Sequence, residues 1–371
     1  MTRRYRRGLV VGKFSPLHRG HMHLIEAALA ACHEVLVISY TKPEFARCDR
    51  AARQAWLDEL FPQVRSLMLD DAGLEQLCTQ RGLPLRRVPH NDEDAEVHRA
   101  FTAWLCRDVC GTTVDAVFTS EDYGDGFAAV LSRWFPPVVD HVCVDRLRVA
   151  VPVSGTRVRA DPHGEAAFLH PAVRAHFIDR VCLLGGESSG KTTLAAALAD
   201  RLATVWAPEV GRERWEEQGG RLGYDDMLAI GRGQVAREDL LARSARRWLV
   251  CDGSALTSLF YSLDGYGQAD PALHALARRR YALTFVCAPD FPFVQDGTRR
   301  DAAFRARQHD WYLEMLARRG MPYTLLAGGP AERLERACAI LAARDGEPAT
   351  GTAAADPVHC ALLRQPGSDK Q

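Results

Sequence analysis

The stretch RVCLLGGESSGKTTLAAALADRL (residues 180–202) decides the fold of the second half of this 371-residue chain. An apolar, strand-like run leads into a glycine-rich turn, and an Ala- and Leu-rich helical pattern follows it. Gly185, Gly190, Lys191 and Thr192 have the spacing G-x-x-x-x-G-K-[ST], whose backbone N–H groups surround a phosphate. The stretch predicts a P-loop, with Lys191 on the β and γ phosphates of ATP and Thr192 on Mg²⁺. The alternative is a plain strand, turn and helix.

Two acidic residues follow strand-like runs downstream of this loop. Glu209 ends TVWAPE, and a carboxylate there suits a kinase, which needs one near the acceptor hydroxyl. Its alternative is an ordinary surface glutamate. Asp252 ends WLVCD, where it could help to hold Mg²⁺ through water or could bind the hydroxyls of the acceptor.

A basic segment, QDGTRRD, follows a further strand-like run. It contains Asp296, Arg299 and Arg300, and the arginines could close on ATP and neutralise charge on its γ-phosphate. A solvated basic loop is the alternative. Thr193, beside Thr192, is also expected to contact ATP.

Short apolar strands alternate with helical patterns through both halves of the chain. This rhythm predicts an α/β protein with two doubly wound parallel sheets, a Rossmann-like domain followed by the P-loop domain. We expect the first domain over residues 1–172 and the second over 173–345. The Ala-, Gly-, Pro- and Thr-rich tail, 346–371, is expected to be disordered.

The first domain carries two separate clusters of anion-binding side chains. GKFSPLHRGH (residues 12–21) follows the first strand and contains Lys13, His18 and His21 at an expected helix start, where phosphate binds well. A second cluster, in VPVSGTRVRAD, contains the hydroxyls of Ser154 and Thr156 and the guanidinium of Arg159. A doubly wound sheet can bring both clusters to its carboxyl edge. Core or capping histidines are the alternative for the first cluster.

These two phrases resemble the H-x-G-H and I-S-x-T-x-x-R signatures of the nucleotidylyltransferase superfamily. Joined to the P-loop, they resemble the bifunctional NadR-type family, which couples nicotinamide-mononucleotide (NMN) adenylyltransferase to ribosylnicotinamide kinase. The resemblance covers residues 8 to about 344 and includes PEVGRE and DGTRRD. It implies nucleotide contacts in the first domain from Gly12, Phe14, Ser120, Glu121, Ser154 and Thr156, and riboside contacts in the second domain from Glu209, Asp252 and Gln234.

Two departures from the family pattern stand out. Where the family often has D-T-D, this chain has CDGS, so that Asp252 is kept and Ser254 replaces the second acid. Some family members begin with a helix-turn-helix domain, whereas this sequence starts almost directly at its first strand, so we expect no DNA-binding regulation.

The resemblance implies two reactions of NAD salvage. The second domain would phosphorylate nicotinamide riboside with Mg-ATP, and the first would join the resulting NMN to ATP, giving NAD and pyrophosphate. Lys13, His18, His21 and Arg159 suit the first domain because a phosphate nucleophile needs no general base. Two alternatives stay open: another vitamin-derived substrate, or a first domain that senses nucleotides with little catalysis.

Composition limits the remaining function classes. The formal net charge is zero, so nothing global indicates nucleic acid as a partner, and no apolar run reaches the length of a membrane span. Eleven cysteines without a C-x-x-C pair suit reduced thiols in a cytoplasmic protein. The expected partners are therefore small molecules, namely ATP, nicotinamide riboside, NMN and NAD, and a homo-oligomer is possible.

Overall fold

The computed structural model describes residues 3–121, 123–136, 138–294 and 300–345. It divides into two compact units, one of Met1–Asp179 with Asp239–Arg247, the other of Arg180–Glu238 with the chain from Trp248 onward. The domain bounds predicted from the sequence differ from this division at the junction and stay a prediction. The predicted tail lies outside the described residues. No helix in the described ranges is long and apolar enough to cross a membrane.

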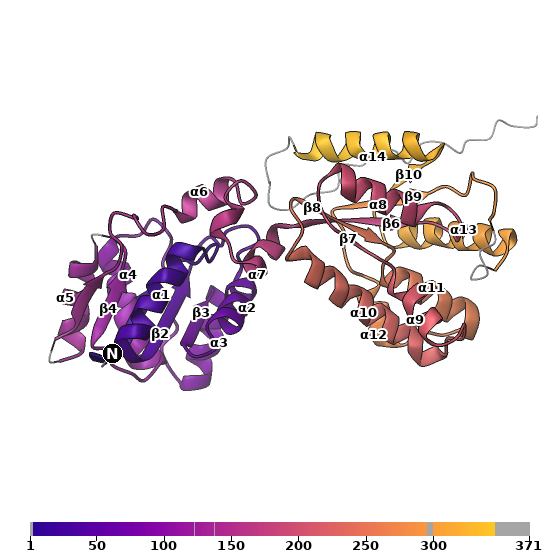
Figure 1. Cartoon of the computed structure of the whole chain (residues 1–371). Coiled ribbons are helices and arrows are strands. Elements are labelled where there is room, and N and C mark those ends of the chain that lie inside the picture. Colours follow the sequence, from indigo (N-terminus) through magenta and orange to yellow (C-terminus); the bar gives the residue numbers. More distant parts are fainter. Residues whose placement is uncertain (1–2, 122, 137, 295–299, 346–371) are drawn as a thin grey trace, which may run out of the picture. The chain divides into compact units, whose positions relative to one another are not determined.

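The first unit is built on a five-stranded sheet in the order β3-β2-β1-β4-β5, and every neighbouring pair runs parallel (Figure 1). Its strands are β1 (Tyr5–Val11), β2 (Cys32–Tyr40), β3 (Arg65–Leu69), β4 (Ala116–Thr119) and β5 (Asp140–Cys143). Its helices are α1 (Arg19–Ala31), α2 (Arg50–Leu60), α3 (Asp71–Arg81), α4 (Ala95–Trp104), α5 (Gly124–Trp134), α6 (Gly155–Ala160) and α7 (Pro171–Arg174).

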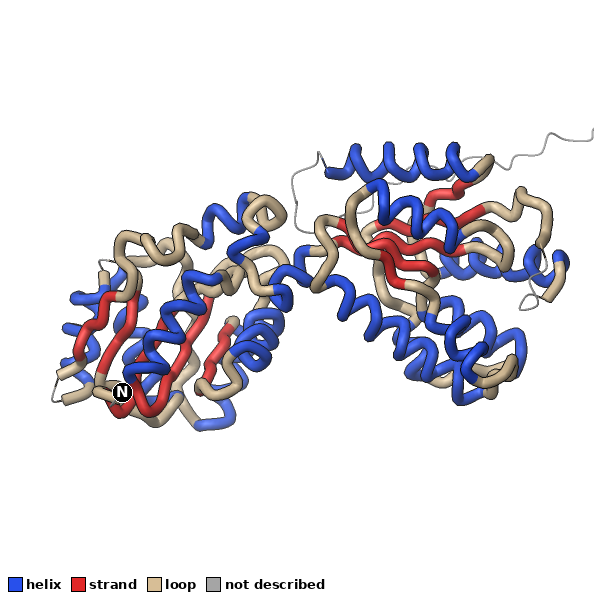
Figure 2. Tube along the Cα trace, in the orientation of Figure 1, coloured by secondary structure: helices blue, strands red, loops and turns tan. Residues whose placement is uncertain are grey.

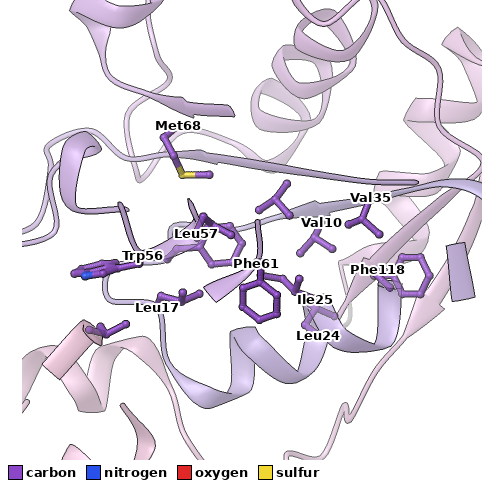
Figure 3. Close-up of a cluster of buried hydrophobic side chains, with 14 of the residues drawn as sticks. Val10, Leu17, Leu24, Ile25, Val35, Trp56, Leu57, Phe61, Met68 and Phe118 are labelled. Atoms are coloured by element: carbon purple, nitrogen blue, oxygen red, sulfur yellow. The ribbon is translucent and has the colours of Figure 1, made fainter. Parts of the chain in front are cut away.

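Successive residues of β1 supply two separate cores because side chains alternate across a strand. Val10 packs with Leu24 and Ile25 of α1 and with Trp56 of α2 on one face, as Figure 3 shows. Leu9 packs on the other face with residues of α3, α4 and α5. Both faces of the sheet are thus covered, as expected for a doubly wound domain.

The second unit has a sheet in the order β10-β9-β6-β8-β7. Its strands are β6 (Asp179–Leu184), β7 (Trp206–Ala207), β8 (Trp248–Asp252), β9 (Leu283–Cys287) and β10 (Thr324–Leu326). Its helices are α8 (Lys191–Arg201), α9 (Val210–Glu217), α10 (Tyr224–Ala242), α11 (Ala255–Tyr266), α12 (Pro271–Leu276), α13 (Ala302–Arg318) and α14 (Pro330–Asp345).

Helices cover both faces of this second sheet (Figure 2). One core joins α8 and α14 to β6, β8 and β9, and the other joins α10, α11, α12 and α13 to the opposite face. The β10–β9, β9–β6 and β7–β8 pairs run parallel. The predicted fold class, two doubly wound α/β units, is confirmed.

Two elements differ from the sequence pattern. The apolar pattern indicates no strand at β3, because this edge strand buries only Met68 and Leu69. The helical pattern runs over residues 224–247, but α10 ends at Ala242, where the polar run from Arg243 forms turns instead.

The strand that comes first in each unit lies in the middle of its sheet. β1 lies between β2 and β4, and β6 lies between β9 and β8. The loops that leave β1 and β6 therefore start at the centre of a carboxyl edge, where open α/β sheets bind their ligands.

Candidate nucleotide sites

The loop after β1 ends in a histidine pair that closes the start of α1. His18 is the N-cap residue, and its Nδ1 accepts a hydrogen bond from the backbone N–H of His21 at 3.3 Å. In return, Nδ1 of His21 accepts from the backbone N–H of His18 at 3.4 Å. The two rings are stacked with their centroids 3.7 Å apart. The histidines therefore satisfy two amide groups that a helix start otherwise leaves without a partner.

This arrangement fixes the chemical state of His18. Burial, assisted by the charges of Arg148 and Arg159, lowers the pKa of His18 to about 4. Burial also lowers the pKa of His21 well below its ordinary value. Because Nδ1 of the neutral His18 ring accepts, its proton lies on Nε2, which is then a hydrogen-bond donor. The ring serves as a neutral donor near neutral pH.

The lowered pKa of His18 predicts that acid weakens the first unit. His18 is 5% exposed, and its pKa of about 4 in the folded state compares with about 6.5 in an unfolded chain. The unfolded state therefore binds the extra proton first as the pH falls through this window. The stabilisation from neutral His18 is complete above about pH 6.5, and about 3 kcal/mol is lost by pH 4. Hydrogen-exchange protection of the β1 amides at several pH values measures this loss.

The control for this experiment is His18→Asn, since Asn also caps helix starts but does not titrate. The difference in protection between wild type and variant isolates His18 from the carboxylates that titrate in both. Equal acid sensitivity of the two proteins would contradict the prediction.

The two clusters of the first unit meet, as the sequence suggested. Arg159 donates to the backbone oxygen of Ser15 at 2.8 Å and to the hydroxyl of Thr156 at 3.1 Å. Ser154 caps α6. A Cβ added to the next residue, Gly155, would lie 3.8 Å from Nε2 of His18. The donor atom of His18 therefore faces the start of α6.

Sequence reasoning missed two residues that shape this site. The ring of Phe45 lies beneath two cations, with the Arg159 guanidinium 4.2 Å and the Lys13 ammonium 6.0 Å from its centre. Burial, and then the charge of Arg159, lowers the pKa of Lys13. Arg148 pairs with Glu121 at 3.0 Å and acts electrostatically on His18. Neither Phe45 nor Arg148 lies in a phrase whose spacing signals a phosphate site.

The remaining predicted residues of this unit differ in accessibility. Glu121 is exposed and Ser120 is half-buried, just after β4. Gly12 bonds through its N–H to the backbone oxygen of Ile38. The Phe14 side chain is fully buried, with its ring edge against His21, so only its backbone can face a nucleotide.

The P-loop of the second unit connects β6 to α8. Lys191 donates to the backbone oxygens of Gly185 at 2.9 Å and Gly186 at 3.1 Å, so its ammonium lies over the loop. Gly190 has φ of +80°, and a Cβ there would lie 3.2 Å from the ring of Phe291. Both facts require glycine at position 190.

Two carboxyl groups gather beside Lys191. The Thr192 hydroxyl donates to one oxygen of Asp252 at 2.6 Å, while the other oxygen is buried without a hydrogen-bond partner among the described residues. Glu209 is the N-cap residue of α9, and its side chain lies near Gly253. Burial raises the pKa of both carboxyl groups, and the charge of Lys191 opposes this.

Two predicted residues of the second unit contact protein groups. Gln234 is buried; it accepts from the backbone N–H of Val210 at 3.1 Å, next to Glu209, and so holds the start of α9. The Arg300 guanidinium bonds Asp264 at 2.8 Å. Their predicted ligand contacts stay predictions, while Asp296 and Arg299 lie outside the described residues.

A hollow of about 300 Å³ adjoins the P-loop. Its lining includes Gly190 and Thr193 from the loop and α8, Phe291 and Pro292 from the segment after β9, and Arg333 of α14. Arg333 is buried, donates to the backbone oxygens of Ser189 and Ala288 and lies over the Phe291 ring. Sequence reasoning missed this hollow, although the aromatic run DFPF after β9 was a signal.

Comparisons with known proteins find relatives for both units of the chain. Residues 9–55 match the "Cytidylyltransferase-like" family model and residues 180–333 match the "AAA domain" model. Over 313 residues the chain is 27% identical to the "Trifunctional NAD biosynthesis/regulator protein NadR" of Escherichia coli. That match covers 79% of this chain and 71% of the relative. The corresponding protein of Salmonella typhimurium has the same identity and coverage.

Two solved structures share the fold. A NadR protein in complex with NAD and AMP-PNP superimposes with a TM-score of 0.65 at 19% identity, over 94% of this chain and 98% of that one. A NadR protein in complex with NR gives 0.66 at 18% identity, over 92% and 96%. The likeness extends over both units and the order in which they follow one another.

Proposed function

We propose that this chain, a relative of the NadR-type proteins, makes NAD from nicotinamide riboside in two steps. The P-loop unit phosphorylates the riboside with ATP, and the first unit transfers the adenylyl group of a second ATP to the resulting NMN. The observation that carries the proposal is the pairing, in one chain, of a site of cations and neutral donors with a site of paired carboxyl groups beside a P-loop lysine.

The first site suits adenylyl transfer because this reaction needs no general base, and none of Lys13, His18, His21 and Arg159 is a carboxylate. The phosphate of NMN is already an anion that can attack the α-phosphorus of ATP, and pyrophosphate leaves. Lys13 and Arg159 supply positive charge to the departing pyrophosphate, and Nε2–H of His18 and His21 donates to its oxygens. Ser154 and Thr156 add hydroxyls, while Ser120 and Glu121 border the mononucleotide.

The second site suits phosphoryl transfer to an alcohol. The ribose 5′-hydroxyl is a weak nucleophile, and we assign Glu209 to accept its proton, a task that its raised pKa assists. Lys191 neutralises the transferred phosphoryl group, and the hollow lined by Phe291 and Thr193 holds the base of ATP. Gln234 and Arg300 complete the substrate surface.

A magnesium ion fits the same site. Thr192 and Asp252 offer hard oxygen ligands, and one oxygen of Asp252 is buried without a partner in the described part of the chain. When bound, Mg²⁺ neutralises the charge of the ATP phosphates. We place both reactions in the cytoplasm, where the free thiols of the described cysteines would stay reduced.

The proposal is tested with the full chain and two separate mixtures. Nicotinamide riboside with Mg-ATP should yield NMN and then NAD, and NMN with Mg-ATP should yield NAD and pyrophosphate. NMN accumulation without NAD would indicate a first unit that binds nucleotides but does not catalyse. Inactivity with both nicotinamide substrates would exclude the proposal.

Removing the imidazole donor should impair only the first reaction. His18→Asn retains a cap for α1 but removes Nε2–H, so NAD formation from NMN should fall by about 10². Riboside phosphorylation should stay near the wild-type rate, which shows that the second unit is unaffected. His21→Asn should have an effect of the same order. Normal NAD formation in both variants would exclude the histidines from the site.

A further inference from the structure

A hydrogen-bond array joins β5 to the end of β4 in the first unit. Nε2 of His141 lies 2.8 Å from the hydroxyl of Thr119, and Nδ1 lies 2.7 Å from a carboxylate oxygen of Asp125. The same Thr119 hydroxyl donates to the backbone oxygen of Glu121 at 3.0 Å. The imidazole is thus linked through one hydroxyl to the backbone of the predicted mononucleotide segment, Ser120–Glu121.

The direction of these bonds follows from counting protons. A threonine hydroxyl has one proton, and here Glu121 accepts it. Nε2 of His141 must then donate to the Thr119 oxygen for the array to be complete, and because the Asp125 carboxylate can only accept, Nδ1 carries a second proton and donates to it. An N–H donor at this position therefore directs the hydroxyl proton toward Glu121.

Packing holds the ring in this place. The His141 side chain is only 12% exposed, and a Cβ added to Gly124 would lie 1.9 Å from its Nε2. Glycine at 124 thus makes room for the ring at the start of α5. The Asp125 side chain is 90% exposed, so its bond contributes little in water. The hydrogen bond between His141 and Thr119 is therefore the one that holds the Ser120–Glu121 backbone.

The segment at the end of this array borders the candidate site. Glu121 pairs with Arg148 at 3.0 Å, and Arg148 also donates to the backbone oxygen of Val153, just before Ser154. The Glu121 carboxylate thus holds Arg148 against the backbone just before Ser154.

We infer that His141 is a positioning residue for the mononucleotide site, acting through Thr119 on the Ser120–Glu121 backbone. This inference rests on the proposed adenylyl transfer to NMN. It assigns to His141 an effect on the binding of the mononucleotide and none on ATP or on the chemical step.

The test compares two substitutions whose side-chain amide groups each replace one of the two ring nitrogens of His141. His141→Gln keeps an N–H near Nε2, and His141→Asn keeps one near Nδ1 only. His141→Asn should raise both the Kd for NMN, measured by calorimetry, and the KM for NMN about fivefold, the order expected for one lost hydrogen bond. His141→Gln should stay within about twofold of wild type. The KM for ATP, kcat and riboside phosphorylation should be unchanged in both.

Three further variants separate positioning from general stability. Thr119→Val removes the hydroxyl and should match His141→Asn, while Thr119→Ser keeps it and should match wild type. Asp125→Asn should change little. Equal NMN affinity in all five variants, or a loss in His141→Gln equal to that in His141→Asn, would overturn the inference. A wild-type chain that binds NMN without making NAD defeats only the proposed function, because the calorimetric comparison still applies. A wild-type chain that does not bind NMN defeats both.

Discussion

Lys191→Ala is expected to lower riboside phosphorylation by at least about 10³, because the ammonium neutralises charge on the transferred phosphoryl group. Among the described residues this ammonium donates to loop oxygens, those of Gly185 and Gly186, so its removal breaks bonds within the loop alone in that part of the chain. The slow transfer to water should be lost together with transfer to the riboside. Both are measured by ADP release with and without nicotinamide riboside.

The control for Lys191 lies on the same helix. Arg201 at the far end of α8 faces Glu335 at 3.6 Å, on the surface, and Arg201→Ala should phosphorylate the riboside at the wild-type rate. NAD formation from NMN should be normal in both variants. A Lys191→Ala protein that retains a tenth of its kinase activity would remove the P-loop lysine from the mechanism.

Glu209→Gln is expected to lower riboside phosphorylation by about 10² to 10⁴, the usual range for the loss of a general base. Glutamine keeps the shape of the side chain but cannot accept the hydroxyl proton, and ATP binding should persist. Asp252 is the competitor for this role, because burial also raises its pKa. However, Asp252 accepts from Thr192, which favours a place at the metal.

The decisive comparison is Glu209→Gln beside Asp252→Asn, with ATP affinity and turnover measured for each. Asp252→Asn should raise the Mg²⁺ concentration needed for half-maximal activity, whereas Glu209→Gln should leave it unchanged. If Glu209→Gln turns over normally and Asp252→Asn is inactive with ATP still bound, the base is Asp252.

The features that could be predicted from the sequence are those whose residues lie close together along the chain. The P-loop, the place of His18 and His21 at a helix start and the strand–helix rhythm each lie within a short stretch, so spacing alone reveals them. The mutual capping of the two histidines was only the alternative interpretation. The meeting of Arg159 with Ser15 was also predictable, because strand ends of a doubly wound sheet share one edge.

The missed residues have roles that only the tertiary structure creates. Phe45 lies in the loop after β2, and its cation–π contacts depend on the loop after β1 and on α6 coming close to it. Phe291 lies about 100 positions after Gly190 in the sequence, yet its ring packs closely against that glycine. No rule based on residue spacing predicts such a contact. His141 acts through Thr119, and a threonine inside an apolar strand gives no signal of its own.

The central position of β1 and β6 also bears on how this chain emerges from the ribosome. β1 has β2 as an early neighbour, but its other neighbour, β4, is synthesised roughly 100 residues later, which takes several seconds at usual elongation rates. Both neighbours of β6, namely β8 and β9, are likewise synthesised after it. During synthesis, the strand before each phosphate-binding loop therefore has at most one neighbouring strand until much of its unit has been made. Nucleotide can stabilise either unit only late in translation, and until then the uncovered edges of β1 and β6 are the surfaces on which a chaperone would act.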